Sequence, residues 1–252
     1  MKSKSLTFPG SQGQDLHGRL DTPDQKKPIA YALFTHCFTC NKNLKPIHNI
    51  SRALVDQGLG VFRFDFTGLG ESKGEFEQTN LTTNIKDVQT AADYMKEHYE
   101  TPALLIGHSM GGSAVLNAAH NVPDCRAVVT LSTPSKPNHL TQLLKAKNPE
   151  VNESDTVTVK IGGRKFTLSK AFFQDLDTHS EESDVASITQ ALLIVHSQHD
   201  EVVNVEHGER LFEQATQPKS IVTLNRSDHL LTSQQDAQYI GQLIAAWMGF
   251  YL

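Results

Sequence analysis

Short apolar segments recur along the chain and predict a buried, mostly parallel sheet. Strands covered on both faces show continuous rather than alternating apolarity. The segments of this kind, rich in β-branched and aromatic residues, are 31–35, 61–64, 103–106, 127–131, 192–195 and 221–224. Two alternating segments before Asp21 predict additional strands, which we expect to be antiparallel and to lie at one edge of the sheet.

Between these segments, apolar residues recur every three or four positions, which is the period of an amphipathic helix. Residues with this spacing are Ile85, Val88, Ala92, Met95 and Tyr99, and later Ile240, Leu243, Ile244 and Trp247. Predicted strands and helices therefore alternate. The alternation predicts an α/β fold, with a doubly wound sheet covered by helices on both faces.

The alternation breaks from about residue 135 to residue 189. Here Gly162-Gly163 separates two runs with a period of two residues, which predicts a β-hairpin whose turn needs positive φ angles. The alternating residues are Val157, Val159 and Ile161 before the turn, and Phe166 and Leu168 after it. We interpret the segment as a lid inserted after the sixth core strand. A surface excursion without a role in binding is the alternative.

Length and composition predict one globular domain over residues 1–252. The chain has 252 residues, of which 38% are hydrophobic, and a net charge of −5. No basic block is present that would neutralise nucleic-acid phosphates, which argues against nucleic acid as a partner. The N-terminus has two lysines with no apolar run behind them, and no segment approaches ~18 consecutive apolar residues. We therefore expect a cytoplasmic protein that has neither a signal peptide nor a membrane partner.

The three cysteines are too few, and odd in number, for a disulfide framework, which agrees with a reducing compartment. Cys37 and Cys40 have the spacing of a thiol redox motif. Two interpretations stay open for this pair. One is a redox or regulatory role, and the other is two small, partly buried residues, because a free cysteine behaves mostly as a small hydrophobe.

Ser109 is the candidate nucleophile. It lies in Gly107-His108-Ser109-Met110-Gly111, directly after a predicted strand and before a helical pattern. A sharp turn from strand to helix requires small residues two positions before and two positions after the serine, and Gly107 and Gly111 meet that requirement. The turn also places Ser109 at a helix N-terminus, where backbone N–H groups favour negative charge.

A serine hydroxyl needs a base to accept its proton and a third group to orient that base. His229 follows the strand predicted at 221–224, and Asp200 follows the strand predicted at 192–195, so both are expected at the carboxyl ends of strands. Asp228 and Glu201 are competing carboxylates. We favour Asp200 because Asp228 adjoins the histidine and Glu201 is displaced by one position.

Two backbone N–H groups are candidates for an oxyanion hole. One is that of Met110, after the nucleophile, and the other is that of Phe38, in the loop after the third strand. His196 and His199 lie beside Asp200, but a zinc site needs three or four convergent ligands. We therefore expect no metal and no other cofactor. Gly68 and Gly70 lack the third glycine of a dinucleotide loop, because position 73 is Lys73.

The order Ser109, Asp200, His229 and the segment His36-Cys37-Phe38-Thr39-Cys40 resemble the α/β-hydrolase family over nearly the whole chain. The resemblance is strongest to its esterase and acyl-hydrolase branch, which carries His-Gly-Phe-Thr-Gly at this place. The sequence of this segment is also similar to that of bacterial hydrolase domains that precede an OsmC-like peroxide-reducing domain. We expect no such second domain here. Residues 65–72 also match a loop of the family. The resemblance implies an α/β-hydrolase fold and ester chemistry.

The resulting hypothesis is a serine hydrolase that cleaves a small-molecule ester or thioester through an acyl-enzyme. Aspartate occupies the elbow in haloalkane dehalogenases and epoxide hydrolases of this family, so a serine favours ester chemistry. The aromatic residues Phe38, Phe76, Phe166, Phe172 and Phe173 are candidates for the acyl pocket. The alternatives are a catalytically silent binding protein with the same fold and a thiol-redox protein acting through Cys37 and Cys40.

Overall fold

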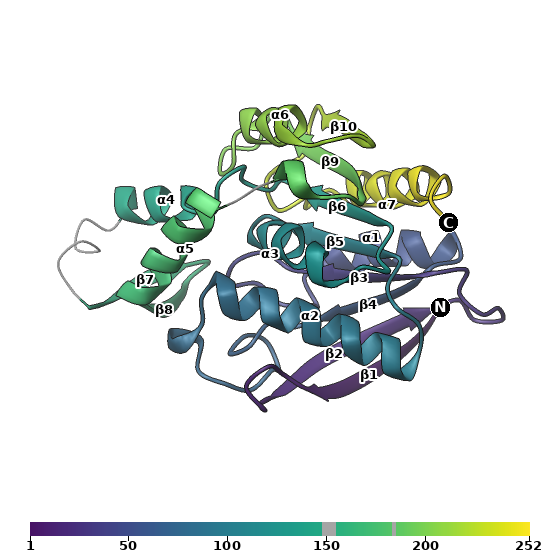
Figure 1. Ribbon diagram of the computed structural model, residues 1–252, viewed down its shortest axis with the longest axis horizontal. Coiled ribbons are helices and arrows are strands. Elements are labelled where there is room, and N and C mark those ends of the chain that lie inside the picture. Colours follow the sequence, from purple (N-terminus) through teal and green to yellow (C-terminus); the bar gives the residue numbers. More distant parts are fainter. Residues whose placement is uncertain (148–154, 183–184) are drawn as a thin grey trace.

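The computed structural model describes residues 1–147, 155–182 and 185–252. Their centre is an eight-stranded sheet with the strand order β1-β2-β4-β3-β5-β6-β9-β10 (Figure 1). Its strands are β1 (Lys2–Pro9), β2 (Asp15–Thr22), β3 (Tyr31–Thr35), β4 (Gly60–Phe64), β5 (Leu104–His108), β6 (Ala127–Leu131), β9 (Ala191–Ser197) and β10 (Lys219–Leu224).

The strand directions agree with the apolar pattern. Within this sheet, neighbouring strands pair in parallel along the order β4-β3-β5-β6-β9-β10. In contrast, β1 pairs antiparallel with β2, and β2 pairs antiparallel with β4. Each predicted parallel strand is present, and β3, β4, β5, β6 and β9 are buried along their whole length. The expected antiparallel strands occupy one edge. The α/β-hydrolase architecture expected from the sequence is therefore confirmed.

Helices cover both faces of the sheet because their apolar residues recur on one side. The helices α1 (Lys45–Asp56) and α7 (Gln234–Met248) contribute to one apolar core. The helices α2 (Leu81–His98), α3 (Met110–Ala118) and α6 (Val205–Gln214) contribute to the core on the other face. No helix of the described residues combines the length and apolarity needed to cross a bilayer.

The start of α2 shows how local sequence sets a boundary. The Asn80 side chain accepts a hydrogen bond from the Thr83 N–H at 2.9 Å, and the Thr83 hydroxyl oxygen accepts one from the Asn80 N–H at 2.8 Å. This reciprocal capping satisfies two N–H groups at the helix start. The helix ends at His98, one residue before the last position of the predicted pattern.

An insertion between β6 and β9 lies beyond one end of the sheet, on the left in Figure 1, whereas both termini lie on the right. Its elements are α4 (His139–Lys147), β7 (Thr156–Ile161), β8 (Arg164–Ser169) and α5 (Lys170–Glu182). The predicted hairpin is present, with φ angles of 55° at Gly162 and 81° at Gly163. Residues 148–154 and 183–184 of the predicted lid lie outside the described residues. Short 3₁₀ helices complete the fold at Phe76–Gln78, Ala119–Asn121 and Val185–Ser187.

Candidate active site

Ser109 lies at the sharp turn between β5 and α3. Its φ angle is 53°, in the left-handed region that a serine rarely adopts, and its N–H donates to the Leu131 carbonyl at 2.8 Å. A side chain would not fit at the flanking glycines. A Cβ atom at Gly107 would lie 2.3 Å from the Gly111 carbonyl oxygen, and one at Gly111 would lie 2.5 Å from the His36 carbonyl oxygen. The strained turn therefore depends on both glycines.

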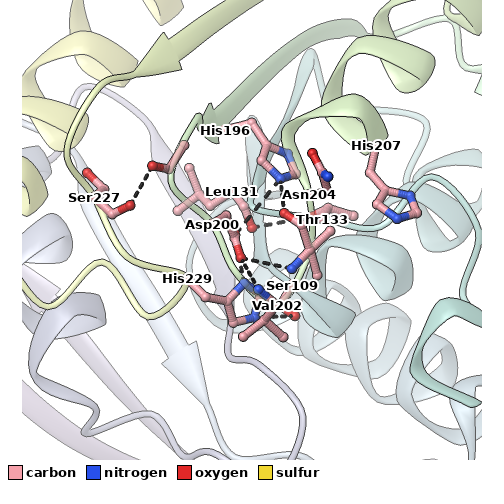
Figure 2. Close-up of polar contacts among 12 residues, drawn as sticks. Ser109, Leu131, Thr133, His196, Asp200, Val202, Asn204, His207, Ser227 and His229 are labelled. Carbon is pink, nitrogen blue, oxygen red and sulfur yellow. Dashed lines mark hydrogen bonds and ion pairs between the residues drawn. The ribbon is translucent and has the colours of Figure 1, made fainter. Parts of the chain in front are cut away.

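Ser109, His229 and Asp200 converge at the carboxyl ends of the parallel strands (Figure 2). The His229 Nε2 atom lies 3.1 Å from the Ser109 Oγ atom, and its Nδ1 atom lies 2.8 Å from Asp200 Oδ2. Because the carboxylate accepts a hydrogen bond from Nδ1, that nitrogen carries the proton and Nε2 is free to accept one from the serine hydroxyl. The arrangement is suited to removing the serine proton.

Of the candidate carboxylates, Asp200 is the one that contacts the histidine. Its other oxygen, Oδ1, accepts hydrogen bonds from the Val202 and Val203 N–H groups at 2.9 and 2.8 Å. Burial by itself raises the pKa of Asp200, but the hydrogen bond and charge of His229 and these N–H groups lower that pKa below its ordinary value. Asp200 therefore stays ionised beside the imidazole.

The rival carboxylates are engaged elsewhere or face solvent. Asp228 accepts hydrogen bonds from the Thr232 N–H at 2.8 Å and the Thr232 hydroxyl at 2.6 Å. Glu201 is exposed. Neither carboxylate competes with Asp200 for the Nδ1 atom of His229.

Two buried histidines donate hydrogen bonds to the backbone beside the site, and the sequence predicted their packing but not these hydrogen bonds. His196 donates from Nε2 to the Val203 carbonyl at 2.8 Å, on the turn that holds Asp200. His108 donates in the same way to the His229 carbonyl. Burial lowers the pKa of both rings, that of His108 to about 3, so both stay neutral. The only available signal was their proximity in sequence to Ser109 and Asp200.

The two histidines near Asp200 lie in different surroundings. His196 is fully buried and bonded to backbone, and His199 is exposed. Across the described ranges, no group of three or more His, Cys, Asp or Glu side chains is arranged to hold a metal ion.

The two predicted oxyanion donors belong to different segments of the chain and line the same cavity. Met110 is the first residue of α3, where N–H groups precede the intrahelical hydrogen bonds. Phe38 lies in a four-residue turn that the Cys40 N–H closes by donating to the Cys37 carbonyl at 3.1 Å. Both residues line one small cavity. The helix dipole at Met110 favours a developing negative charge there.

A buried ion network holds the loop that follows this turn. The Lys42 ammonium lies 2.6 Å from Asp65 Oδ2, and the two side chains are 2% and 1% exposed. Arg63 donates to the Lys42 carbonyl at 2.5 Å and pairs with Asp21 at 2.6 Å. These contacts join the loop after β3 to the loop after β4. Separating the loops would leave uncompensated buried charges, so the network stabilises their arrangement.

Cys37 and Cys40 form a disulfide. The interpretation of both as free, small hydrophobic residues is therefore wrong. They are the first and last residues of the turn, and their Cα atoms lie 5.3 Å apart, which is within the range a disulfide spans. The redox-motif spacing is compatible with this bond, but the sequence left the state of the two cysteines open because it does not specify the turn. Cys125 is free and buried, and burial raises the pKa of its thiol to about 12.

An aromatic cavity adjoins the oxyanion donors. The side chains of Phe38, Phe76 and Phe172 line it, with ring centroids of Phe38 at 5.9 Å from Phe76 and 5.5 Å from Phe172. Of the other predicted pocket residues, Phe166 packs on Phe76 and Phe173 packs on Phe172, behind the lining. The remaining lining residues are His36, Cys37, Phe66, Leu69, Thr79, Asn84, Met110 and Gly111.

The hairpin of the insertion contacts the same region. The Arg164 guanidinium donates to the Thr39 carbonyl and lies over the Phe166 ring, 5.1 Å from its centroid. The hairpin of the insertion is therefore in contact with the turn that carries Phe38.

Comparison with known proteins places these features in a family. Residues 40–165 match the hydrolase family described as serine aminopeptidase, S33. The esterase domain of a Rhodothermus marinus protein is 42% identical, with a TM-score of 0.82, over 100% of this chain and 99% of that one.

Two further relatives match over most of the chain. YfhR of Salmonella typhi, an uncharacterised protein, is 25% identical over 245 residues, which are 91% of this chain and 75% of YfhR. The mouse mitochondrial palmitoyl-protein thioesterase ABHD10 is 23% identical over 186 residues, which are 71% of this chain and 62% of that protein.

Proposed function

The chain belongs to the serine aminopeptidase S33 family of hydrolases and has the α/β-hydrolase fold, and on that premise we propose that it cleaves carboxylic esters or thioesters through Ser109, His229 and Asp200. The observation that carries this proposal is the continuous chain of hydrogen bonds from Ser109 Oγ through the His229 ring to Asp200, at 3.1 and 2.8 Å. A hydroxyl, a neutral imidazole and an ionised carboxylate in this order make a serine nucleophilic.

The proposed reaction is a two-step acyl transfer. His229 accepts the Ser109 proton as the Oγ atom attacks the carbonyl carbon, and Asp200 stabilises the imidazolium that forms. The N–H groups of Met110 and Phe38 donate to the developing oxyanion. The imidazolium then protonates the leaving group, and water activated by His229 hydrolyses the acyl-enzyme in the second step.

The cavity supports an ester or thioester substrate over a peptide with a free N-terminus. An aminopeptidase must bind the ammonium group of its substrate, and the described residues that line this cavity include no carboxylate. The cavity has a volume of only about 10 Å³, so its aromatic rings must move apart to admit an apolar acyl group. The relatives agree with this choice, since one is named an esterase domain and another a palmitoyl-protein thioesterase.

The proposal is tested with a Ser109→Ala variant and a matched Ser113→Ala control. Ser113 lies one turn along the same helix, and its buried hydroxyl has no partner among the described residues. We expect Ser109→Ala to lose roughly 10⁵–10⁶-fold in kcat on p-nitrophenyl esters, whereas Ser113→Ala keeps its activity. A folded Ser109→Ala protein that still hydrolyses p-nitrophenyl acetate at the wild-type rate contradicts the proposal.

A fluorophosphonate probe separates the hydrolase from a silent binding protein with the same fold. The probe forms a covalent bond only with an activated serine, so we expect it to label Ser109 in the wild type and in Ser113→Ala. A wild-type protein that is not labelled favours the binding protein. A series of p-nitrophenyl esters and thioesters of increasing acyl length then measures which acyl groups the aromatic cavity accepts.

A further inference from the structure

The turn from Cys37 to Cys40 holds one of the two proposed oxyanion donors in a strained conformation. Phe38 and Thr39 are its central residues, and Thr39 has a φ angle of 61°. A turn with positive φ at its third position is usually formed with glycine or asparagine there. Threonine is β-branched and rarely adopts this region, so the turn has a conformation that its own sequence disfavours.

The direction of the Phe38 N–H is set by the Cys37 carbonyl. Both groups belong to one planar trans peptide unit, so they point in opposite directions. The carbonyl accepts hydrogen bonds from the Cys40 N–H at 3.1 Å and from His36 Nδ1 at 2.8 Å. His36 Nε2 accepts a hydrogen bond from the Phe66 N–H at 3.2 Å, so Nδ1 carries the ring hydrogen. Contacts that hold this carbonyl therefore aim the oxyanion donor.

The disulfide is the covalent link between the two ends of this turn. It joins the residue whose carbonyl orients the Phe38 amide to the residue whose N–H closes the turn. Cys37 is buried, 4% exposed, whereas Cys40 is partly exposed. A reducing thiol in solution therefore reaches the sulfur of Cys40 more readily than that of Cys37.

We propose that the Cys37–Cys40 disulfide positions the Phe38 amide for the transition state, and that its reduction by a dithiol lowers turnover reversibly. This inference rests on the proposed hydrolase function. Without the covalent link, only hydrogen bonds to the Cys37 and Thr39 carbonyls hold the disfavoured φ angle of Thr39, and loss of that angle rotates the Cys37–Phe38 peptide plane. The Phe38 N–H then no longer points at the position of the oxyanion. The hydrogen bond that is lost stabilises the transition state more than the bound ground-state substrate.

The redox step exchanges two electrons and two protons between the protein and a dithiol. A thiolate of the dithiol attacks Cys40 Sγ, the S–S bond breaks, and Cys37 leaves as a thiolate that takes up a proton. The second thiol of the reagent attacks the mixed disulfide and releases the Cys40 thiol. The reagent ends as a cyclic disulfide, and oxidised glutathione drives the reverse exchange.

The experiment measures kcat and KM on p-nitrophenyl acetate for the oxidised protein, for the same protein reduced with dithiothreitol, and after reoxidation. All proteins carry Cys125→Ser, which removes the buried free thiol, and thiol alkylation followed by mass measurement verifies each state. Loss of one oxyanion donor costs about 10²–10³-fold in kcat, and we expect misalignment to cost roughly 10–100-fold. KM should change by less than about threefold, and reoxidation should restore kcat.

Two variants serve as matched controls. A Cys37→Ser/Cys40→Ser variant should have the low kcat of the reduced protein and should not respond to dithiothreitol. A Cys37→Gly/Cys40→Gly variant should also ignore dithiothreitol, because it has no sulfur at the turn. The affinity for phenylboronic acid, which forms a tetrahedral adduct with the serine, should fall with kcat on reduction. Circular dichroism and the thermal midpoint show whether the reduced protein is folded at the assay temperature.

The outcomes separate the inference from the proposed function. An oxidised protein that hydrolyses the ester and is labelled by the fluorophosphonate, but whose full reduction leaves kcat and boronate affinity unchanged, overturns the inference alone. A fall in kcat that only accompanies unfolding overturns it as well. An oxidised protein that neither hydrolyses esters nor is labelled overturns the proposed function, and the inference with it.

Discussion

His108 and His229 are 121 residues apart in the chain, yet the Nε2 atom of His108 lies 2.8 Å from the backbone carbonyl oxygen of His229. Their ring centroids are 5.4 Å apart. Because a carbonyl oxygen only accepts, His108 carries a hydrogen on Nε2 and donates it. The residue beside the proposed nucleophile thus fixes the backbone of the proposed base. This contact joins the elbow after β5 to the loop after β10.

Removing this donor should lower turnover while the fold survives. In His108→Leu the buried His229 carbonyl loses its partner, which costs about 1–3 kcal/mol, and we expect kcat to fall roughly 10–100-fold. His108→Gln places an amide donor at a similar distance from the backbone and should recover most of the activity. Steady-state kinetics with thermal unfolding checks both variants. Equal kcat values for His108→Leu and the wild type contradict the role.

Replacing Asp200 should reduce kcat far more than replacing its neighbour. In Asp200→Asn the side-chain amide presents a donor to His229 Nδ1 and favours the wrong tautomer, so kcat should fall about 10⁴-fold with little change in KM. Glu201→Gln removes one carboxylate from the adjacent, exposed position and should stay within about twofold of the wild type. A similar loss in the two variants, measured on one ester, is the result that rejects Asp200.

Asp87 should make the free energy of unfolding depend on pH. Its carboxylate is fully buried on α2, accepts hydrogen bonds from the Thr67 N–H and hydroxyl at 2.9 and 2.8 Å, and has a second oxygen without a partner among the described residues. Burial raises the pKa of Asp87 from 3.8 to about 6, against the smaller opposite effect of the Thr67 hydrogen bonds. Between these two pH values the folded protein binds a proton that the unfolded chain has released.

The sign follows from that difference in bound protons. Since the folded state binds more protons over this range, the free energy of unfolding falls as pH rises from 3.8 to 6, by about 2–3 kcal/mol. Asp87→Asn should lack this fall, whereas Asn in place of the exposed Asp93 on the same helix should keep it. Urea unfolding at pH 4.5 and pH 7 measures the difference. Parallel pH dependences in the wild type and Asp87→Asn would show that Asp87 does not titrate as expected.

Phe76 should limit the length of the acyl group. Its ring lines the aromatic cavity beside Phe38, so Phe76→Ala opens space there. We expect kcat/KM for p-nitrophenyl octanoate to rise at least roughly tenfold relative to the acetate, because even one additional methylene group held in an apolar pocket is worth about 1–3 kcal/mol. Phe250→Ala, at a side chain that is 88% exposed, is the control and should leave the ratio unchanged. If Phe76→Ala leaves the ratio of kcat/KM for octanoate to that for acetate unchanged, the acyl group does not bind in this cavity.

The sequence by itself determined the features that depend on near neighbours in the chain. Continuous apolar runs indicated the parallel strands, and Gly162-Gly163 indicated the hairpin, because burial and φ angles act over a few residues. The elbow around Ser109 was predicted for the same reason. The catalytic roles of Ser109, His229 and Asp200 stay predictions that the experiments above test.

Only the tertiary structure decided which distant groups meet. It placed the Asp200 carboxylate 2.8 Å from the Nδ1 atom of His229, 29 residues away in the chain. It also brought His108 to the carbonyl of His229. The physical reason is that strand order and register set these distances, and local patterns of apolar and polar residues do not encode them.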